Sequence, residues 1–384
     1  MVNRVVLNET SYFGRGSREK LGEELKARGY SKVLLVTDFN LMDSNVTKMV
    51  IDVLESIGIA YFVYLHVKPN PTVKNVQDGL MLGQISNVDA IVAVGGGSVI
   101  DTAKAISIIM TNPEHSSVVT LAGAVNTRNK GLPLFALPTT AGTAAEVTIN
   151  YVITDENATK KMVCVDPHDI PVCSIIDPDL MQGMPQQLAA STGMDALTHA
   201  MEGYTTKAGW LVPDMFHINA MALIYKNLER AVNNKDDIAI EKMAYAQYIA
   251  GMGFSNVGLG IVHSMAHQLG AVYDTPHGIA NAILLPTVMR FNGVVCADRF
   301  REILCHIGRE DARYLNDQDV INTFVWKIQE LSKECGVTIT VKDTGCKEED
   351  LEMLADKAME DPCRPGNPRE TTKEDFIRLF REAM

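Results

Sequence analysis

Residues 92–105 read VAVGGGSVIDTAKA. Three consecutive glycines, Gly95, Gly96 and Gly97, separate an apolar run from a helix-forming stretch that Ser98 opens. Glycines allow a tight turn and a close approach of the backbone to a ligand, and the free N–H groups of a helix N-terminus attract an anion. The stretch therefore predicts a buried strand, a turn and a helix, with the turn as a phosphate-binding site. A plain strand-to-helix turn is the alternative, because the G-x-G-x-x-G spacing of the usual dinucleotide fingerprint is absent.

An alternation of apolar and amphipathic stretches extends this pattern across the first half of the chain. The apolar runs that predict buried strands are 32–38, 60–65, 90–97 and 133–140, and the stretches with helical periodicity are 17–28, 43–56, 73–86 and 98–110. This order predicts a parallel sheet with helices on both faces. Residues 147–154 and 160–167, separated by the turn-forming sequence DENA, predict an added β-hairpin.

Long helical segments with almost no strand-like alternation follow the sequence MQGMPQQ at 181–187. A chain of 384 residues exceeds the size at which one hydrophobic core usually stops growing, so two domains are expected. We predict an α/β domain with a parallel sheet over residues 1–185 and an all-α domain over residues 186–384.

Composition and charge argue against several classes of function. The formal net charge of −12, without a cluster of Lys or Arg, disfavours nucleic acid as a partner. The N-terminus lacks the apolar core of a signal peptide, and no uninterrupted apolar run approaches the roughly 20 residues needed to cross a bilayer. The 7 cysteines form no C-x-x-C pair, which suits reduced thiols. We therefore expect a cytoplasmic protein with no membrane partner.

Polar residues follow two other predicted strands. Asp38 ends the strand at 32–38, where a carboxylate can accept hydrogen bonds from a ribose 2′-hydroxyl and repel a 2′-phosphate. The sequence PTTAGTAAE places Thr139, Thr140 and Thr143 after another strand, where small hydroxyl residues can line a nucleotide crevice. Each residue alone could be an ordinary polar strand end, but together with the glycine turn they indicate a nucleotide site.

The second half of the chain carries a cluster of ligand-type residues. Asp195 and His199 are four residues apart in TGMDALTHAMEGY, which on a helix puts both on one face, about 6 Å apart at Cβ. His263 and His267 repeat that spacing in VHSMAH, and His277 follows in the loop sequence YDTPHG. A metal site, a proton relay and coincidence are all compatible with three histidines this close together.

For any one histidine on an apolar helix, the simplest interpretation is a core residue satisfied by one hydrogen bond. For the set this is harder to sustain, because burying four polar side chains without a shared partner costs about 2 kcal/mol or more each, whereas one divalent ion compensates all of them. His217 and His306 lie in stretches that predict polar, amphipathic helices, and we assign them no role.

Four ordered motifs resemble the iron-dependent alcohol dehydrogenases, often called group III. They are GGGSVIDTAKA (95–105), PTTAGTAAEVT (138–148), GMDALTHAMEGY (193–204) and HSMAHQLGAVYDTPHGIANAILLP (263–286). The resemblance runs from about residue 10 to the C-terminus. It implies a Rossmann-like N-terminal domain, a helical C-terminal domain, and hydride transfer between NAD(H) and a short-chain aldehyde or alcohol. Lactaldehyde and 1,2-propanediol are the first expected pair, and 1,3-propanediol or a broad range of short-chain alcohols is the alternative.

The resemblance also implies roles for particular residues. The metal ligands would be Asp195, His199, His263 and His277, with iron(II) as the family's metal and zinc as an alternative. His267 matches a position near the substrate and the nicotinamide, so it would be a proton-relay or substrate-orienting residue. The residues matching dinucleotide contacts in the family are Asp38, Gly95, Gly96, Gly97, Ser98, Asp101, Thr139, Thr140, Thr143, Asn150 and Lys161.

The substrate pocket is the part least defined by the motifs. By resemblance, Phe254 and Cys363 would form apolar walls suited to a short substrate, with plain packing as the alternative for Cys363. Thr287 departs from the family pattern, since many relatives carry His after the proline of LLPTVMRFN. This departure touches no ligand.

Two other functions compete with this interpretation. A non-redox enzyme of related architecture, such as a sugar-phosphate cyclase, would also use NAD and a metal, but Lys and Arg for a phosphorylated substrate are scarce between 245 and 290. A structural metal-binding module without catalysis would need no phosphate turn or threonine motif, and this chain has both.

The N-terminal sequence NRVVLNETSYFG (3–14) predicts a strand ahead of the first helix. A lone terminal strand leaves an exposed edge, and pairing with the same strand of a second subunit satisfies both edges under two-fold symmetry. We therefore expect a homodimer formed through this strand. The alternative is a strand that joins its own sheet.

Overall fold

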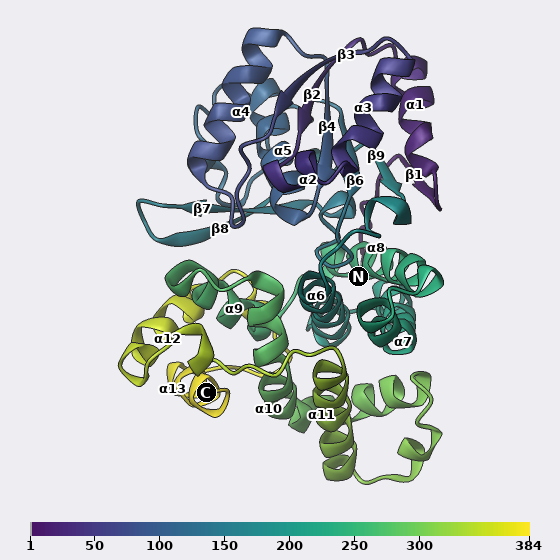
Figure 1. Ribbon diagram of the computed structural model, residues 1–384. Coiled ribbons are helices and arrows are strands. Elements are labelled where there is room, and N and C mark those ends of the chain that lie inside the picture. Colours follow the sequence, from purple (N-terminus) through teal and green to yellow (C-terminus); the bar gives the residue numbers. More distant parts are fainter. Residues whose placement is uncertain (1) are drawn as a thin grey trace. The chain divides into compact units, whose positions relative to one another are not determined.

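The computed structural model describes residues 2–384, which divide into two compact units. Unit 1 comprises the chain up to Thr140 together with Ala144–Met184, and unit 2 comprises Ala141–Thr143 together with Pro185–Met384. Figure 1 shows that the strands lie in unit 1 and that unit 2 is built of helices.

The strands of unit 1 form two sheets. They are β1 (Thr10–Phe13), β2 (Lys32–Val36), β3 (Ala60–Tyr64), β4 (Ala90–Gly95), β5 (Gly123–Ala124), β6 (Leu134–Pro138), β7 (Asn150–Asp155), β8 (Lys160–Val165) and β9 (Cys173–Ile176). The main sheet has the order β1-β9-β6-β4-β2-β3, with neighbours paired in parallel. β7 and β8 form an antiparallel hairpin, and β5 pairs with β8. The predicted parallel sheet is therefore confirmed, and the structure contains the expected hairpin.

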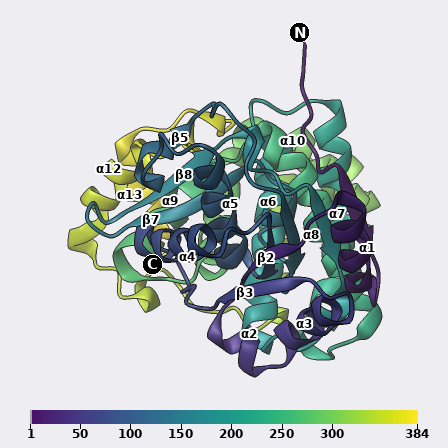
Figure 2. The ribbon, with the colours of Figure 1, turned by 90° about the horizontal axis from the view of Figure 1, so that it is seen from above.

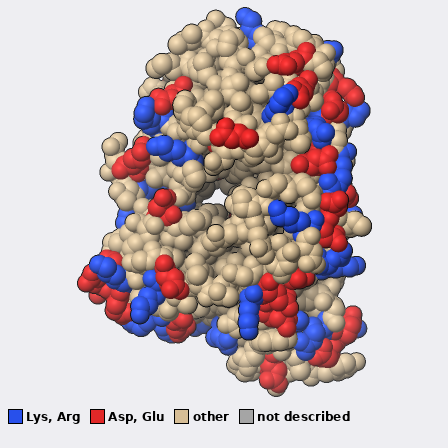
Figure 3. Space-filling view, in the orientation of Figure 1, with Lys and Arg blue, Asp and Glu red and all other residues tan. Residues whose placement is uncertain are grey.

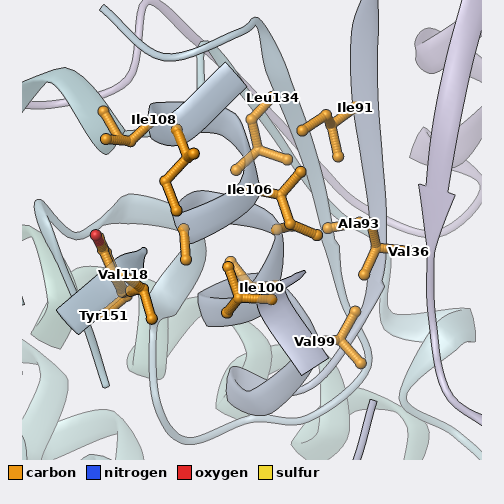
Figure 4. Close-up of a cluster of buried hydrophobic side chains, with 14 of the residues drawn as sticks. Val36, Ile91, Ala93, Val99, Ile100, Ile106, Ile108, Val118, Leu134 and Tyr151 are labelled. Atoms are coloured by element: carbon orange, nitrogen blue, oxygen red, sulfur yellow. The ribbon is translucent and has the colours of Figure 1, made fainter. Parts of the chain in front are cut away.

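Helices cover both faces of the main sheet. Successive strand residues point to opposite sides, so the apolar strands present side chains on both faces that the helices bury. The helices of unit 1 are α1 (Lys20–Arg28), α2 (Phe39–Asp43), α3 (Val46–Ser56), α4 (Val73–Ser86) and α5 (Gly97–Thr111). In β4, Ile91 and Ala93 pack toward α4 and α5, whereas Val92 and Val94 pack toward α1 and α3. Figure 4 shows the first of these cores, in which Ile100 of α5 and its neighbours meet the sheet residues.

Unit 2 is mostly helical, as predicted. Its helices are α6 (Gln186–Thr205), α7 (Leu211–Asn233), α8 (Asp237–Val257), α9 (Ile261–Tyr273), α10 (His277–His306), α11 (Asp317–Glu334), α12 (Leu351–Met359) and α13 (Lys373–Glu382). Helix α10 is long and apolar enough to meet a length-and-composition criterion for a membrane span, but 67% of the window concerned is buried inside the protein. It is thus placed as a core helix of this unit.

The N-terminal segment differs from the lone strand expected over residues 3–14. Only Thr10–Phe13 forms a strand, β1, and it pairs in parallel with β9 of its own sheet. The apolar strand β9, which the sequence reading missed, provides that partner within the chain. Residues 2–7 have no regular secondary structure, and Figure 2 shows the N-terminal end of the chain projecting from the ribbon. The alternative, a strand that joins its own sheet, is therefore the one observed.

His217 corrects a second expectation, because its helix is not polar around it. The side chain on α7 is 0% exposed, and neither ring nitrogen has a hydrogen-bond partner among the described residues. Burial lowers the pKa of His217 to about 3, with smaller contributions from Arg299 and His199. The ring lies between Gly203 of α6 and Gly253 of α8, where a Cβ atom would come within 2.3 Å and 2.2 Å of Nε2. Two glycines thus make room for one buried imidazole.

The surface carries charges of both signs. On the face in Figure 3, Lys and Arg residues are interspersed with Asp and Glu residues, and neither sign gathers into a broad patch there.

Gly203→Ala and Gly253→Ala are each expected to destabilise the protein despite the better helix propensity of alanine. Overpacking against the His217 ring should cost roughly 1–3 kcal/mol, more than the approximately 1 kcal/mol gained in a helix interior. Gly83→Ala in α4 is the matched control, because its Cβ would meet neighbours at ordinary distances of 3.5 Å or more. Chemical denaturation should show lower midpoints for the first two variants and a raised one for the control; equal midpoints would contradict the argument.

Candidate active site

Four ligand-type side chains converge inside unit 2. Asp195 and His199 lie on one face of α6, His263 lies in α9, and His277 is the first residue of α10. One ligand atom from each lies within 4.8 Å of the others. Three of the side chains are buried and His277 is partly buried. The structure therefore brings together all four residues that the sequence predicted as metal ligands.

Asn281, one turn after His277, lies among these ligand atoms. Its Nδ2 is 2.7 Å from Asp195 Oδ1, 3.1 Å from His263 Nε2 and 3.1 Å from His277 Nε2. An amide nitrogen only donates and carries two hydrogens, so it can serve two of these three atoms, and an Nε2 atom that pairs with it presents a lone pair. Atoms coordinating one ion at about 2.0–2.2 Å lie roughly 3–4 Å apart, and the set needs little contraction to reach that spacing. Its donor chemistry and geometry fit a divalent cation.

His199 is held in the neutral form that metal coordination requires. Burial lowers its pKa to about 4, although the nearby Asp195 partly opposes this. Its buried Nδ1 makes no hydrogen bond to the described residues. Phe254 of α8 stacks on the imidazole at 4.3 Å between ring centroids, with 11° between the planes. The predicted pocket residue Phe254 therefore covers one face of a candidate ligand.

A second group adjoins the first through His267. Its ring stacks with that of His277 at a centroid distance of 5.6 Å. On the other side, His267 Nδ1 is 2.8 Å from Asp361 Oδ2, and the Cys363 backbone N–H donates to Asp361 Oδ1 at 2.9 Å. Burial raises the pKa of Asp361, but His267 and the hydrogen bonds from Cys363 outweigh this, so the net pKa is lowered. Asp361 is therefore a carboxylate, and His267 Nδ1 donates to it.

Cys363 is half-buried beside this pair. Burial and the charge of Asp361 raise the pKa of its thiol well above the usual value. A neutral thiol is weakly polar and packs like a small apolar side chain. Both interpretations made from sequence, a pocket wall and plain packing, are compatible with this environment.

The predicted phosphate turn follows β4, a central strand of the main sheet. It lies at the carboxyl end of that strand, where the strand order reverses. β3 and β4 flank β2 on opposite sides, and such a reversal is the usual ligand crevice of an open α/β sheet. Asp38 follows β2 and caps α2 by accepting a hydrogen bond from the Leu41 N–H at 3.0 Å. Gly95 ends β4, Gly97 begins α5, and Ser98 is the second residue of that helix.

Close packing explains two glycines of this turn, Gly95 and Gly96. A Cβ at Gly95 would come within 2.5 Å of Val99, and one at Gly96 within 3.1 Å of Thr140. Thr139, which follows β6, donates its N–H to the Gly95 carbonyl at 3.1 Å. The structure therefore brings Thr139 and Thr140 to the glycine turn.

The other residues predicted to contact the dinucleotide do not belong to the glycine turn. Asp101, one turn into α5, accepts a hydrogen bond from the Val152 N–H at 2.9 Å, and burial raises its pKa to about 6. Asn150 begins β7, and Lys161 of β8 donates to Asn70 Oδ1 at 2.8 Å. These three residues thus lie where α5 meets the hairpin. Thr143 belongs to unit 2, whereas Thr139 and Thr140 belong to unit 1.

Sequence reasoning missed several residues that organise these sites. Glu202 follows Asp195 by seven positions and is 2.6 Å from His263 Nδ1, so its helical spacing was a usable signal. Asn281 follows His277 by four positions, which is a similar signal. Asp361 lies far from His267 in the chain, and no local pattern connects them. Lys104 is fully buried in α5 and donates to Thr148 and Asn150 carbonyl oxygens at 2.6 and 2.9 Å.

Comparison with known families covers almost the whole chain. Residues 8–178 match the family described as iron-containing alcohol dehydrogenase, and residues 189–384 match the C-terminal part of the same family. The chain belongs to the iron-containing alcohol dehydrogenase family. The family membership indicated by the four sequence motifs is therefore confirmed.

Relatives within the iron-containing alcohol dehydrogenases are similar along their full lengths. The lactaldehyde reductase of Escherichia coli strain K12 is 49% identical over 383 residues, which cover 100% of both chains. A solved 1,3-propanediol oxidoreductase superposes with a TM-score of 0.96 at 38% identity, covering 100% of both chains. A sulfoacetaldehyde reductase from Bifidobacterium kashiwanohense, solved with NAD+, gives a TM-score of 0.89 at 29% identity and covers 100% of this chain and 99% of its own.

Proposed function

We propose that this chain is a metal-dependent oxidoreductase that transfers a hydride between NAD(H) and a short-chain aldehyde or alcohol. Unit 1 would bind the dinucleotide, and unit 2 would hold the metal and the substrate. The observation that carries the proposal is the convergence of Asp195, His199, His263 and His277, with ligand atoms within 4.8 Å of one another. In the direction of reduction, aldehyde, NADH and one proton give alcohol and NAD+.

The four convergent residues would hold an iron(II) or zinc ion. When bound, such an ion supplies Lewis-acid polarisation of a carbonyl oxygen. The chain's own contribution includes a neutral His199 imidazole, since burial keeps the pKa of that ring near 4. Apolar cover such as the Phe254 ring over His199 excludes water from this side of the site.

The His267–Asp361 pair supports a proton-transfer role for His267. The Asp361 carboxylate fixes the proton on Nδ1, which leaves Nε2 of His267 as the atom that exchanges a proton with substrate. During alcohol oxidation Nε2 would accept the hydroxyl proton, and the adjacent carboxylate would stabilise the resulting imidazolium. During aldehyde reduction the same atom would return the proton.

Unit 1 offers a dinucleotide site at the reversal of strand order. The glycine turn at the start of α5 would receive the pyrophosphate, because helix N-terminal N–H groups and the helix dipole favour an anion. Asp38, at the carboxyl end of the adjacent strand β2, would accept hydrogen bonds from the ribose hydroxyls. Asp101, Asn150 and Lys161 would extend the contacts along α5 and the hairpin.

Lactaldehyde and 1,2-propanediol are the substrate pair that we propose first. The relative with 49% identity over the full length is a lactaldehyde reductase. Phe254 and the neutral thiol of Cys363 would form apolar walls that suit a three-carbon substrate. The 1,3-propanediol enzyme with a TM-score of 0.96 makes 1,3-propanediol the alternative.

Removal of bound metal is expected to lower kcat/KM for lactaldehyde reduction at least 100-fold, because about 3 kcal/mol of transition-state stabilisation would be lost. Iron(II) or zinc should restore activity. Asp195→Asn should show reduced metal content, while Asp298→Asn, on a fully exposed side chain of α10, should not. Full activity in protein without a transition metal would refute the proposal, and a tenfold preference for another aldehyde would change only the substrate.

NAD(H) should be preferred over NADP(H), because the Asp38 carboxylate repels a 2′-phosphate. Asp38→Ser keeps an oxygen that can cap α2 but removes the charge. We expect the ratio of kcat/KM for NADPH to that for NADH to rise about tenfold, equivalent to about 1.4 kcal/mol. Asp43→Ser, at the end of the same helix, is the charge-matched control. An unchanged ratio in Asp38→Ser would reject this role.

We also propose a homodimer that forms through the N-terminal segment. Val2, Val5 and Leu7 are exposed by 99%, 37% and 38% on a segment without regular structure. β1 is the terminal strand in the order of the main sheet, and a strand at a sheet edge favours pairing with another chain. A second copy under two-fold symmetry would cover both features at once.

Deletion of residues 1–7 tests this assembly while leaving Asn8, whose Nδ2 donates to the Glu146 and Pro171 carbonyl oxygens. The truncated chain should sediment as a monomer, or unfold at a lower temperature than the full chain. Replacement of Val2, Val5 and Leu7 by serine should weaken the dimer in the same direction. A truncated chain that remains a dimer with unchanged thermal stability would place the interface elsewhere.

A further inference from the structure

Glu202 lies on the same face of α6 as Asp195 and His199, seven and three residues after them. Its side chain is 2% exposed. The carboxylate accepts hydrogen bonds from the Val262 N–H at 2.7 Å and the His263 N–H at 3.3 Å, and it lies 2.6 Å from His263 Nδ1. A buried carboxylate with three donors is thus in direct contact with one candidate ligand.

These contacts fix the tautomer of His263. A carboxylate only accepts hydrogen bonds, so His263 Nδ1 carries the ring proton. Nε2 then has a lone pair, which independently agrees with the Asn281 amide donor 3.1 Å from it. The lone pair faces the point on which Asp195 and His277 also converge.

Glu202 also links two helices of the site. Gly260 is the N-cap of α9 and provides no side-chain cap. Glu202 instead accepts hydrogen bonds from two backbone N–H groups in the first turn of that helix. A negative charge there is favoured by the helix dipole. A Cβ at Gly260 would lie 2.8 Å from Glu202 Oε1, so glycine allows this approach. The carboxylate therefore joins α6 to α9, which together supply three of the four candidate ligands.

We infer that Glu202 is a positioning residue for the metal site, and the inference rests on the proposed metal-dependent function. It orients the His263 ring so that Nε2 faces the ion, and its charge makes that nitrogen a stronger ligand. Carboxylate partners of ligand histidines act in this way in metal sites generally. Glu202 itself would not contact the ion, because its oxygens are engaged by α9.

Glu202→Gln preserves the size of the side chain but replaces an acceptor by a group that can donate to His263 Nδ1 and favour the wrong tautomer. The variant should bind zinc 10–100-fold more weakly, measured by competition with a chromogenic chelator. Glu302→Gln is the control. Glu302 of α10 accepts a hydrogen bond from Tyr204, which lies on α6 as Glu202 does, but it is not among the partners of the four candidate ligands. Its zinc affinity should equal that of the parent protein.

A measurement on the unsubstituted protein does not depend on how the variant folds. The ¹⁵N shifts of the histidine rings distinguish the tautomers, and the His263 signals can be assigned by their loss in His263→Gln. We expect the Nδ1–H form in the metal-free and zinc-loaded states. An Nε2–H form in the metal-free protein, or unchanged zinc affinity in Glu202→Gln, would overturn the positioning role and leave the proposed function standing. Parent protein that binds no transition metal would overturn both.

Discussion

The burial of several polar side chains around one point is the constraint on which the organisation of unit 2 depends. Asp195, His199 and His263 have almost no contact with solvent, and the pKa of His199 is lowered to about 4 by that burial. Such groups are tolerated inside a protein only when each finds a partner. The Asn281 amide meets three of the four ligand atoms in the described structure, and its own Oδ1 is left without a hydrogen bond. A cation would satisfy the same atoms more completely than an amide does.

Carboxylates outside the ligand set decide which ring atoms face that point. Glu202 accepts a hydrogen bond from His263 Nδ1–H, and Asp361 accepts one from His267 Nδ1–H. In both cases Nε2 is left with a lone pair, but the consequences differ. His263 Nε2 faces the other candidate ligands, whereas His267 Nε2 would exchange a proton under the proposed function. Two neighbouring histidines on one helix can therefore have different roles, because each ring is oriented by a different acidic residue from outside α9.

The fold was predictable from local patterns in the sequence, and so was part of the candidate metal site, whereas the full set of four candidate ligands came from the resemblance to a family. The continuous apolar run of β4, which is buried along its whole length, and the four-residue spacing of Asp195 and His199 are both visible within a few residues. β9 and Asp361 were missed because their partners lie far away in the chain. His217 was misjudged because two glycines on other helices create its buried position. The expectation of a lone N-terminal strand was wrong for the same reason, since β1 pairs with β9 from a distant segment of the chain.

The donor set also limits how the ion is chosen. Three imidazole nitrogens and one carboxylate oxygen suit iron(II) and zinc alike, and the Irving–Williams order favours zinc in free competition. A thiolate ligand would add to that preference, but Cys363 groups with His267 and Asp361 and not with the four convergent residues. Burial and the charge of Asp361 further keep its sulfur protonated. Cys363 is therefore outside the candidate ligand set, and the four convergent residues include no group that selects iron. Occupancy by iron would then depend on which metal is supplied when the protein folds, and not on discrimination by these side chains.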